Sequence, residues 1–211
     1  MSDISLQECL NTMPLVAVLR GIAPDEVLAV GETLVEAGFK IMEVTINSLA
    51  PLESIRLLAD AYGSQALVGA GTVLSAEIAI EVANAGGRLI VMPHADTSVI
   101  RAGKTKNCFV LAGISTPTEA FAALEAGADG LKLFPAEGAP PAVLQAMRAV
   151  LPPEVPVLPV GGITTETMGG YWAVGASGFG LGSNLYKAGK SNSEIKAAAD
   201  AYVRTMNELR R

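Results

Sequence analysis

Short apolar runs alternate with longer amphipathic segments along the chain, and the alternation repeats eight times. Most of the runs are almost continuously apolar, which is typical of parallel strands whose outer face is covered by helices. We predict strands over Leu15–Arg20, Ile41–Ile46, Ala66–Thr72, Leu89–Pro93, Cys108–Gly113, Gly130–Phe134, Val155–Gly161 and Gly178–Gly182.

The segments between the runs carry the start and stop signals of helices. Proline and acidic residues stand where first turns are expected, as in Pro24-Asp25-Glu26, and several segments end in Ala-Gly, as at Ala37-Gly38. Residues 1–12 predict a short leading helix that covers the bottom of a barrel, and 193–211 predict a last helix. Eight strand–helix units without an interdomain linker favour a single-domain (β/α)8 TIM barrel, with a doubly wound open sheet as the alternative.

Composition narrows the partners and the location that we expect. The net charge is −6 and no basic block is present, so nucleic acid is not an expected partner, whereas a small anionic ligand stays open. Two cysteines and one histidine are too few for a zinc site built on those ligands, and no metal is expected. No apolar run reaches the ~18 residues of a membrane span. The N-terminus lacks the pattern of a signal peptide, so the expected location is the cytoplasm.

One lysine stands inside a strand-like apolar run. Lys132 lies between Leu131 and Leu133, and an isolated lysine is rare in a buried strand because desolvation disfavours the ammonium form. The neutral amine is the form that attacks a carbonyl carbon to make a Schiff base. The alternative interpretation is a lysine whose stem lies along the strand while its head group reaches water.

The alternation of side chains along a strand predicts that other ionisable groups point into the barrel together with Lys132. Glu43 shares a strand face with Thr45, whereas the opposite face of that run is wholly apolar and suits packing against helices. The same rule points Arg20, and Lys132 with Phe134, into the barrel. We interpret Glu43 as a paired structural carboxylate or as a general acid/base, and Arg20 as its partner or as a ligand of a substrate carboxylate. Three such groups converging on a barrel interior, which is normally apolar, favour a functional site.

Glycine-rich segments follow the last two predicted strands. Gly161 and Gly162 follow the seventh strand, and Gly182 and Ser183 follow the eighth. Loops in these two positions hold a phosphate in many barrels, through backbone N–H groups and a helix N-terminus. The alternative is a pair of tight turns that need glycine for their backbone conformation.

Two further candidate site residues stand at the ends of the third and fourth predicted strands. Thr72 ends the third run, and we interpret it either as a hydrogen-bond partner of a substrate or as the cap of the following helix. Pro93 closes the fourth run. His94, just beyond it, is interpreted as a rim residue or loop contact rather than a base.

Together, these segments resemble the KDPG/KDPGal class I aldolases, which act on 2-keto-3-deoxy-6-phospho sugar acids. The resemblance covers nearly the whole chain and rests on Leu19-Arg20-Gly21, Glu43-Val44-Thr45, Val68-Gly69-Ala70-Gly71-Thr72-Val73, Pro93, Gly113-Ile114-Ser115-Thr116, Lys132-Leu133-Phe134-Pro135-Ala136, Val160-Gly161-Gly162-Ile163 and Gly182-Ser183. It implies a homotrimeric barrel that cleaves its substrate to pyruvate and D-glyceraldehyde 3-phosphate, through a covalent imine and without a cofactor.

The resemblance also implies roles for the matching residues. Lys132 corresponds to the Schiff-base lysine and Glu43 to the general acid/base. The implied substrate contacts are Arg20, Thr72, Pro93 and Phe134, and the implied phosphate site is Gly161, Gly162, Gly182 and Ser183.

The segment after Glu43 separates two members of the family. The gluconate-specific type resembles Glu-Val-Thr-Leu-Arg-Thr, whereas this chain continues from Thr45 into Ile46-Asn47-Ser48, without the arginine. Asn47-Ser48 and Leu19-Arg20-Gly21 resemble the galactonate type, although Thr45 stands where that type has proline. The expected substrate is therefore 2-dehydro-3-deoxy-6-phosphogalactonate, with the gluconate epimer or dual specificity as the alternative. Outside the family, the rivals are a phosphate-ligand barrel isomerase without an imine and a non-catalytic phosphate-ligand binding protein.

Overall fold

All eight predicted strands are present in the computed structural model, which describes residues 4–211. They are β1 Leu15–Leu19, β2 Ile41–Thr45, β3 Leu67–Gly71, β4 Leu89–Val91, β5 Phe109–Ile114, β6 Gly130–Leu133, β7 Val157–Pro159 and β8 Phe179–Leu181. The helices are α1 Leu6–Thr12, α2 Pro24–Ala37, α3 Pro51–Tyr62, α4 Ala76–Asn84, α5 Thr97–Thr105, α6 Pro117–Glu125, α7 Pro141–Arg148, α8 Thr165–Ala173 and α9 Asn192–Leu209, with a 3-10 turn η1 at Ala136–Gly138.

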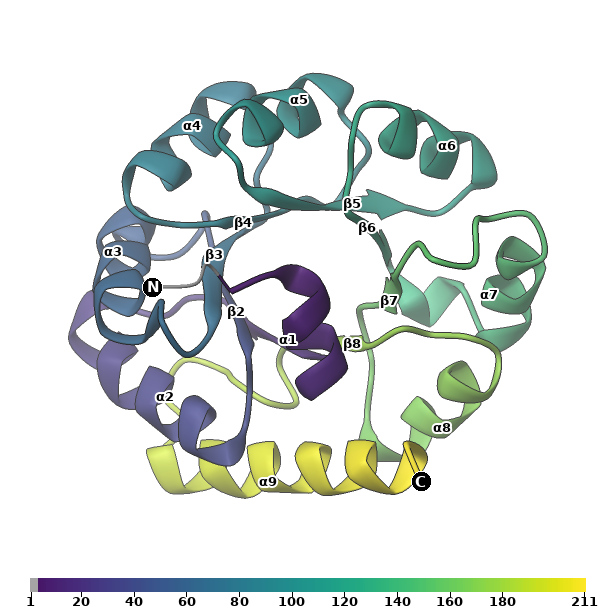
Figure 1. Cartoon of the computed structure of the whole chain (residues 1–211). Helices are drawn as coiled ribbons and strands as arrows, with labels where there is room; N and C mark the ends of the chain where they lie inside the picture. Colours follow the sequence, from purple (N-terminus) through teal and green to yellow (C-terminus); the bar gives the residue numbers. More distant parts are fainter. Residues whose placement is uncertain (1–3) are drawn as a thin grey trace.

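The strands form a ring that the helices surround (Figure 1). They pair in parallel in the order β7-β6-β5-β4-β3-β2-β1-β8, and a parallel bridge between Val160 and Gly180 joins the two ends. The prediction of a (β/α)8 barrel is confirmed, and the open-sheet alternative is wrong. Because the strands all point the same way, the loops that follow them open at one end of the barrel.

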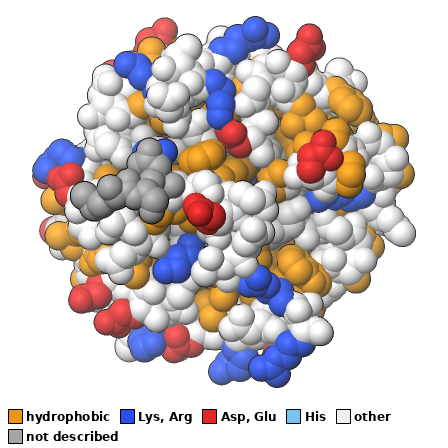
Figure 2. Space-filling view, viewed as in Figure 1, with side chains coloured by type: hydrophobic (Ala, Val, Ile, Leu, Met, Phe, Trp, Pro, Cys, Tyr) orange, Lys and Arg blue, Asp and Glu red, His pale blue; other side chains and the backbone are white. Residues whose placement is uncertain are grey.

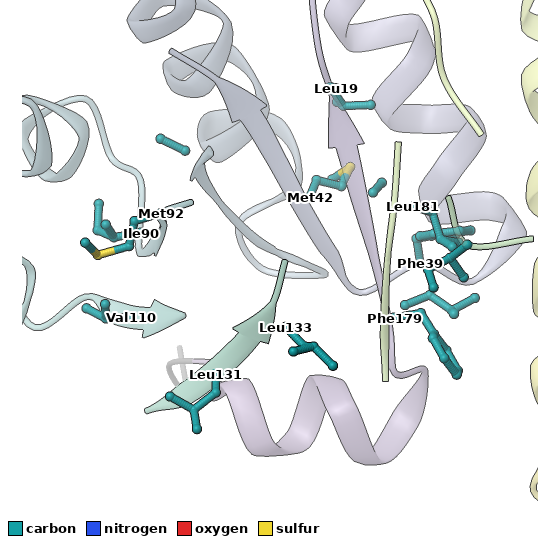
Figure 3. Close-up of a cluster of buried hydrophobic side chains, with 14 of the residues drawn as sticks. Leu19, Phe39, Met42, Ile90, Met92, Val110, Leu131, Leu133, Phe179 and Leu181 are labelled. Atoms are coloured by element: carbon teal, nitrogen blue, oxygen red, sulfur yellow. The ribbon is translucent and has the colours of Figure 1, made fainter. Parts of the chain in front are cut away.

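Two apolar layers explain the strand pattern. Outward side chains such as Leu131 and Leu133, which leave β6 on the same side in Figure 3, belong to the core between strands and helices. Inward side chains, among them Val16 and Leu158, pack with Leu6, Cys9 and Leu10 of α1. Each fully buried leucine stabilises the fold by about 1.5–3 kcal/mol. Helix α1 thus closes the N-terminal end of the barrel, as predicted.

Helix α1 starts later than its prediction. It begins after Ser5, whose hydroxyl accepts from the Glu8 amide at 3.2 Å while the Glu8 carboxylate accepts from the Ser5 amide at 3.0 Å. Residues 1–3 of the predicted helix lie outside the described residues. On the face that α1 covers, side chains of both charge signs are interspersed (Figure 2). Between residues 4 and 211, no helix is both long and apolar enough to span a bilayer.

Strand β7 ends earlier than predicted, and the conformation of the glycines after it explains this end. Gly161 and Gly162 have φ of +109° and +63°, and a strand cannot continue through such values. The left-handed glycines predicted after helices are confirmed at Gly38, Gly86 and Gly127. The chain therefore leaves β7 early and turns across the end of the barrel.

Candidate functional site

The C-terminal ends of the strands surround a cavity of about 460 Å³, within the usual range of small-molecule sites. Seven of the ten candidate residues line it, namely Arg20, Lys132, Phe134, Gly161, Gly162, Gly182 and Ser183. A second depression of about 380 Å³ lies at the opposite end, next to Leu67 and Gly86. Active sites of such barrels are built at the C-terminal end, so the larger cavity is the candidate.

Lys132 and Glu43 meet inside the barrel. Lys132 comes from β6 and Glu43 from β2, and the Nζ–Oε1 distance is 4.0 Å. The residues are 6% and 1% exposed, so the lysine head group lies inside the protein rather than in bulk water. The Lys132 Nζ also lies 5.1 Å from the centre of the Phe134 ring. A cavity of about 10 Å³ beside both residues adjoins the larger one at Val18.

The Glu43 carboxyl is buried without a full set of partners. Burial raises its pKa, and the nearby charges of Lys132 and Arg20 oppose that rise only in part. Among the described residues its Oε2 finds no hydrogen-bond partner. An unpaired buried acceptor costs about 1–3 kcal/mol, and such groups are rare unless a ligand or water completes them. A carboxyl of this kind suits general acid/base chemistry.

Gly71 provides the space that this carboxyl occupies. A Cβ on Gly71, at the end of β3, would lie 2.5 Å from Glu43 Oε1. No side chain fits at that distance without displacing the carboxyl. The glycine in the third predicted strand is therefore required by the position of Glu43.

We expect Gly71→Ala to lower kcat by about tenfold or more, because a displacement of about 1 Å at a catalytic group can cost 10²-fold. Steady-state kinetics measure the effect, and circular dichroism checks that the fold is kept. Gly169→Ala in α8 is the matched control, since its Cβ would meet only Leu209 at 3.6 Å. Equal kcat values for Gly71→Ala and wild type would contradict the expectation.

Arg20 lies at the rim, just beyond β1. Its Nη1 donates to the Asn47 Oδ1 at 3.3 Å, and within the described residues no ion pair joins it to Glu43. The Gly21 amide donates to Ser48 Oγ at 2.9 Å, and that hydroxyl lies 3.1 Å from Thr45 Oγ1. Asn47 and Ser48 therefore join the ends of β1 and β2 and orient the guanidinium toward the cavity that it lines.

Hydrogen bonds hold the two glycine loops in place. The Ile163 carbonyl, directly after Gly162, accepts from the Tyr202 hydroxyl at 2.9 Å and from the Asn184 side chain at 3.1 Å. Lys190 Nζ donates to the Asn184 carbonyl at 2.9 Å. The positive φ values of Gly161 and Gly162 show that this loop needs glycine, whereas a Cβ built on Gly182 would meet no atom within 4 Å. The lining of the cavity places Gly161, Gly162 and Gly182 where a ligand can reach them.

Thr72 and Pro93 lie at the same end of the barrel but line neither cavity. Thr72 has a φ of +59°, a left-handed conformation that costs about 1–3 kcal/mol in a non-glycine residue and is concentrated at functional sites. Its predicted capping role is wrong, because Ser75 Oγ accepts from the Ile78 amide and caps α4. His94 is exposed in the loop after β4, and its carbonyl accepts from the Gly113 amide at 3.2 Å.

Three further polar residues line the larger cavity: Glu137, Asn184 and Lys187. Sequence reasoning missed them because they follow strands β6 and β8, Glu137 in the 3-10 turn η1 and the other two in a loop, where side chains no longer alternate between two faces. The one available signal was closeness in sequence to Lys132 and Ser183.

The chain was compared with known proteins. The sequence pattern described as aldolase, KDPG and KHG aldolase, matches residues 6–199. A 2-dehydro-3-deoxy-6-phosphogalactonate aldolase of Escherichia coli (strain K12) is 44% identical over 196 residues, which are 93% of this chain and 96% of that protein. A 2-dehydro-3-deoxy-phosphogluconate aldolase of Haemophilus influenzae is 30% identical over 169 residues, 79% and 78% of the two chains.

A solved structure described as native KDPGal gives a TM-score of 0.92 at 44% identity, covering 93% of this chain and 96% of that one. The matched region contains both groups of the buried pair and both glycine loops. The chain therefore belongs to the KDPG and KHG aldolase family.

Proposed function

We propose that this chain is a Schiff-base (class I) aldolase that cleaves 2-dehydro-3-deoxy-6-phospho-D-galactonate to pyruvate and D-glyceraldehyde 3-phosphate. The observation that carries the proposal is the buried pair of Lys132 Nζ and Glu43 Oε1, 4.0 Å apart, beside a cavity that the glycine loops also line. An amine and a carboxyl are the two groups that cleavage through an imine needs.

The proposed reaction starts with the amine of Lys132. The uncharged amine attacks the C2 ketone, and loss of water from the carbinolamine gives an iminium ion. Glu43, directly or through a water, then removes the proton of the C4 hydroxyl. The C3–C4 bond breaks, its electrons move into the iminium to give an enamine, and the aldehyde leaves.

The second half of the proposed reaction returns the enzyme to its starting state. Glu43 helps to deliver a proton to C3 of the enamine, and its Oε2, which has no partner among the described residues, is available to bond the water or hydroxyl that carries the proton. Hydrolysis of the iminium releases pyruvate and restores the Lys132 amine. The imine supplies the electron sink, so the proposed reaction uses no metal and no organic cofactor.

The rest of the cavity positions the substrate in this proposal. Arg20, oriented by Asn47, binds the carboxylate or a hydroxyl, and Phe134 lines the cavity beside it. Thr72 and Pro93, at the same end of the barrel but outside the cavity lining, are assigned the remaining substrate contacts by the resemblance to the family. The phosphate binds at Gly161, Gly162, Gly182 and Ser183. A phosphate held at the glycine loops and a ketone held at Lys132 fix both ends of one extended molecule.

The assembly and location are part of the same proposal. We propose a homotrimer in the cytoplasm. Exposed large apolar side chains are the candidates for its interface, among them Leu49, Leu74 and Phe121, which are 70%, 58% and 46% exposed. Both cysteines are free, as is usual in a reducing compartment.

Trapping of the imine tests the mechanism. Wild-type protein incubated with pyruvate and borohydride is expected to gain the mass of one reduced pyruvyl group, located on Lys132 by peptide mass spectrometry. A phosphate-ligand isomerase or a binding protein without an imine would stay unmodified. An unmodified Lys132 would therefore remove the proposed mechanism.

The substrate is tested by assaying the two C4 epimers side by side. We expect kcat/KM to be higher for the galactonate epimer by about 10-fold or more, because one or two polar contacts set such a preference. Asn47 and Ser48, in place of an arginine, support this order, as does the higher identity to the galactonate-type relative. Equal values would indicate dual specificity, and the reverse order would contradict the assignment.

A further inference from the structure

Glu137 lies directly on the glycine loop. A Cβ built on Gly161 would stand 2.2 Å from Glu137 Oε2, and one built on Gly162 would stand 2.7 Å from Glu137 Cγ. The side chain therefore lies flat against the backbone of both residues. Its carboxylate rests at the loop to which the proposed function assigns the phosphate.

The fold, rather than chance packing of a side chain, brings Glu137 to this place. It is the middle residue of η1, and the Ala136 amide donates to the Val160 carbonyl at 2.9 Å. The Tyr171 hydroxyl donates to the carbonyls of Ala136 and Ala139 at 2.9 and 3.1 Å. The backbone of η1 is thus joined to the end of β7 and to α8, whereas Glu137 itself is exposed.

The charge of Glu137 opposes that of the other groups around the cavity. Among the described residues that line it, Arg20, Lys132 and Lys187 are the basic residues and Glu137 is the single acid. A carboxylate and a phosphate dianion at one loop repel each other. Movement of the Glu137 carboxylate away from the loop therefore favours binding of a phosphorylated ligand there.

We propose that Glu137 is a specificity-determining residue, an anionic side chain that occupies the glycine loop in the free enzyme and is displaced by the phosphate of the ligand. The inference rests on the proposed function for the identity of the ligand. Its consequence is weaker binding of every phosphorylated ligand, the aldehyde phosphate product included, and therefore faster release of that product. Ligands without a phosphate do not require the displacement.

Glu137→Gln, which keeps the shape and removes the charge, tests this proposal. We expect the dissociation constant of inorganic phosphate, measured by isothermal titration calorimetry, to fall about tenfold, as for the removal of one repelling charge at a partly hydrated site. The KM of the phosphorylated substrate is expected to fall with it, whereas the KM of the same 2-keto-3-deoxy sugar acid without phosphate stays unchanged. Glu137→Ala is expected to strengthen phosphate binding at least as much.

The matched control is Glu154→Gln, which removes an exposed acid at the N-terminal end of β7, and we expect wild-type phosphate binding there. Phosphate binding that is unchanged or weaker in Glu137→Gln would overturn the inference, since Glu137 would then not compete for the loop. The phosphate titration needs no turnover. If wild type cleaves neither epimer, the proposed function fails while the titration still decides the role of Glu137.

Discussion

Replacement of Lys132 by methionine is expected to abolish cleavage, with a loss in kcat on the order of 10⁵-fold or more, as found when a nucleophile is removed. Without the amine no iminium forms, and the electrons of the C3–C4 bond have no sink. Methionine has nearly the same length and suits a residue that is 6% exposed, so the barrel is expected to fold. Steady-state kinetics and borohydride trapping with pyruvate measure the two losses.

Two controls separate chemistry from folding in that experiment. Lys196→Met removes an exposed lysine that pairs with Asp200 on α9, and its turnover is expected to match wild type. Lys132→Met is expected to keep phosphate binding, because the glycine loops are held by Tyr202 and Asn184 and not by Lys132. Turnover within tenfold of wild type would show that the imine does not form on this lysine.

Glu43→Gln is expected to lower kcat by about 10²–10⁴-fold, the usual contribution of a general acid/base. Glutamine fits the space beside Gly71, but it cannot accept the C4 hydroxyl proton. Trapping of pyruvate by borohydride is expected to continue, since the Lys132 amine is still present. Near-normal turnover would remove the acid/base role, and a complete loss of trapping would show that Glu43 is needed to form the imine itself.

The pH dependence of cleavage is an independent test of the role of Glu43. Burial raises the pKa of Glu43, so as the pH falls this carboxyl takes up its proton earlier than an exposed glutamate does. Cleavage that requires the carboxylate form is therefore expected to fall on the acid side at a pH above the ordinary glutamate pKa of ~4.3. This acid limb is expected to be absent from the residual activity of Glu43→Gln, and Glu154→Gln, an exposed acid, should keep the wild-type profile.

The barrel could be predicted because its strands carry their pattern locally. Runs such as the one around Ala17 are apolar on both faces, and only a parallel sheet covered by helices buries both faces. Strand alternation also predicted that Glu43 and Lys132 point inward, and both side chains lie inside the barrel. The same rule failed to give the partner of Arg20, because this residue lies beyond the last hydrogen-bonded residue of β1.

The loops were less predictable, for a physical reason that Thr72 and Glu137 illustrate. For Thr72 the sequence left a substrate contact and a helix cap open, because a threonine before a helix has the same local signal as the true cap, which is Ser75. The approach of Glu137 to Gly161 depends on the Ala136–Val160 and Tyr171 hydrogen bonds, which join segments far apart in the sequence. No short pattern encodes such contacts.

The sequence by itself therefore determined the strand–helix alternation, the inward direction of Glu43 and Lys132 and the glycine turn at Gly161-Gly162, because each follows from local apolar periodicity or from the special backbone freedom of glycine. Only the tertiary structure decided that the amine and the carboxyl lie 4.0 Å apart, that Glu43 Oε2 has no partner among the described residues, and that Glu137 lies against Gly161 and Gly162. These distances are set by how the ring of strands closes and where the loops are held, and both depend on contacts between residues remote in the chain.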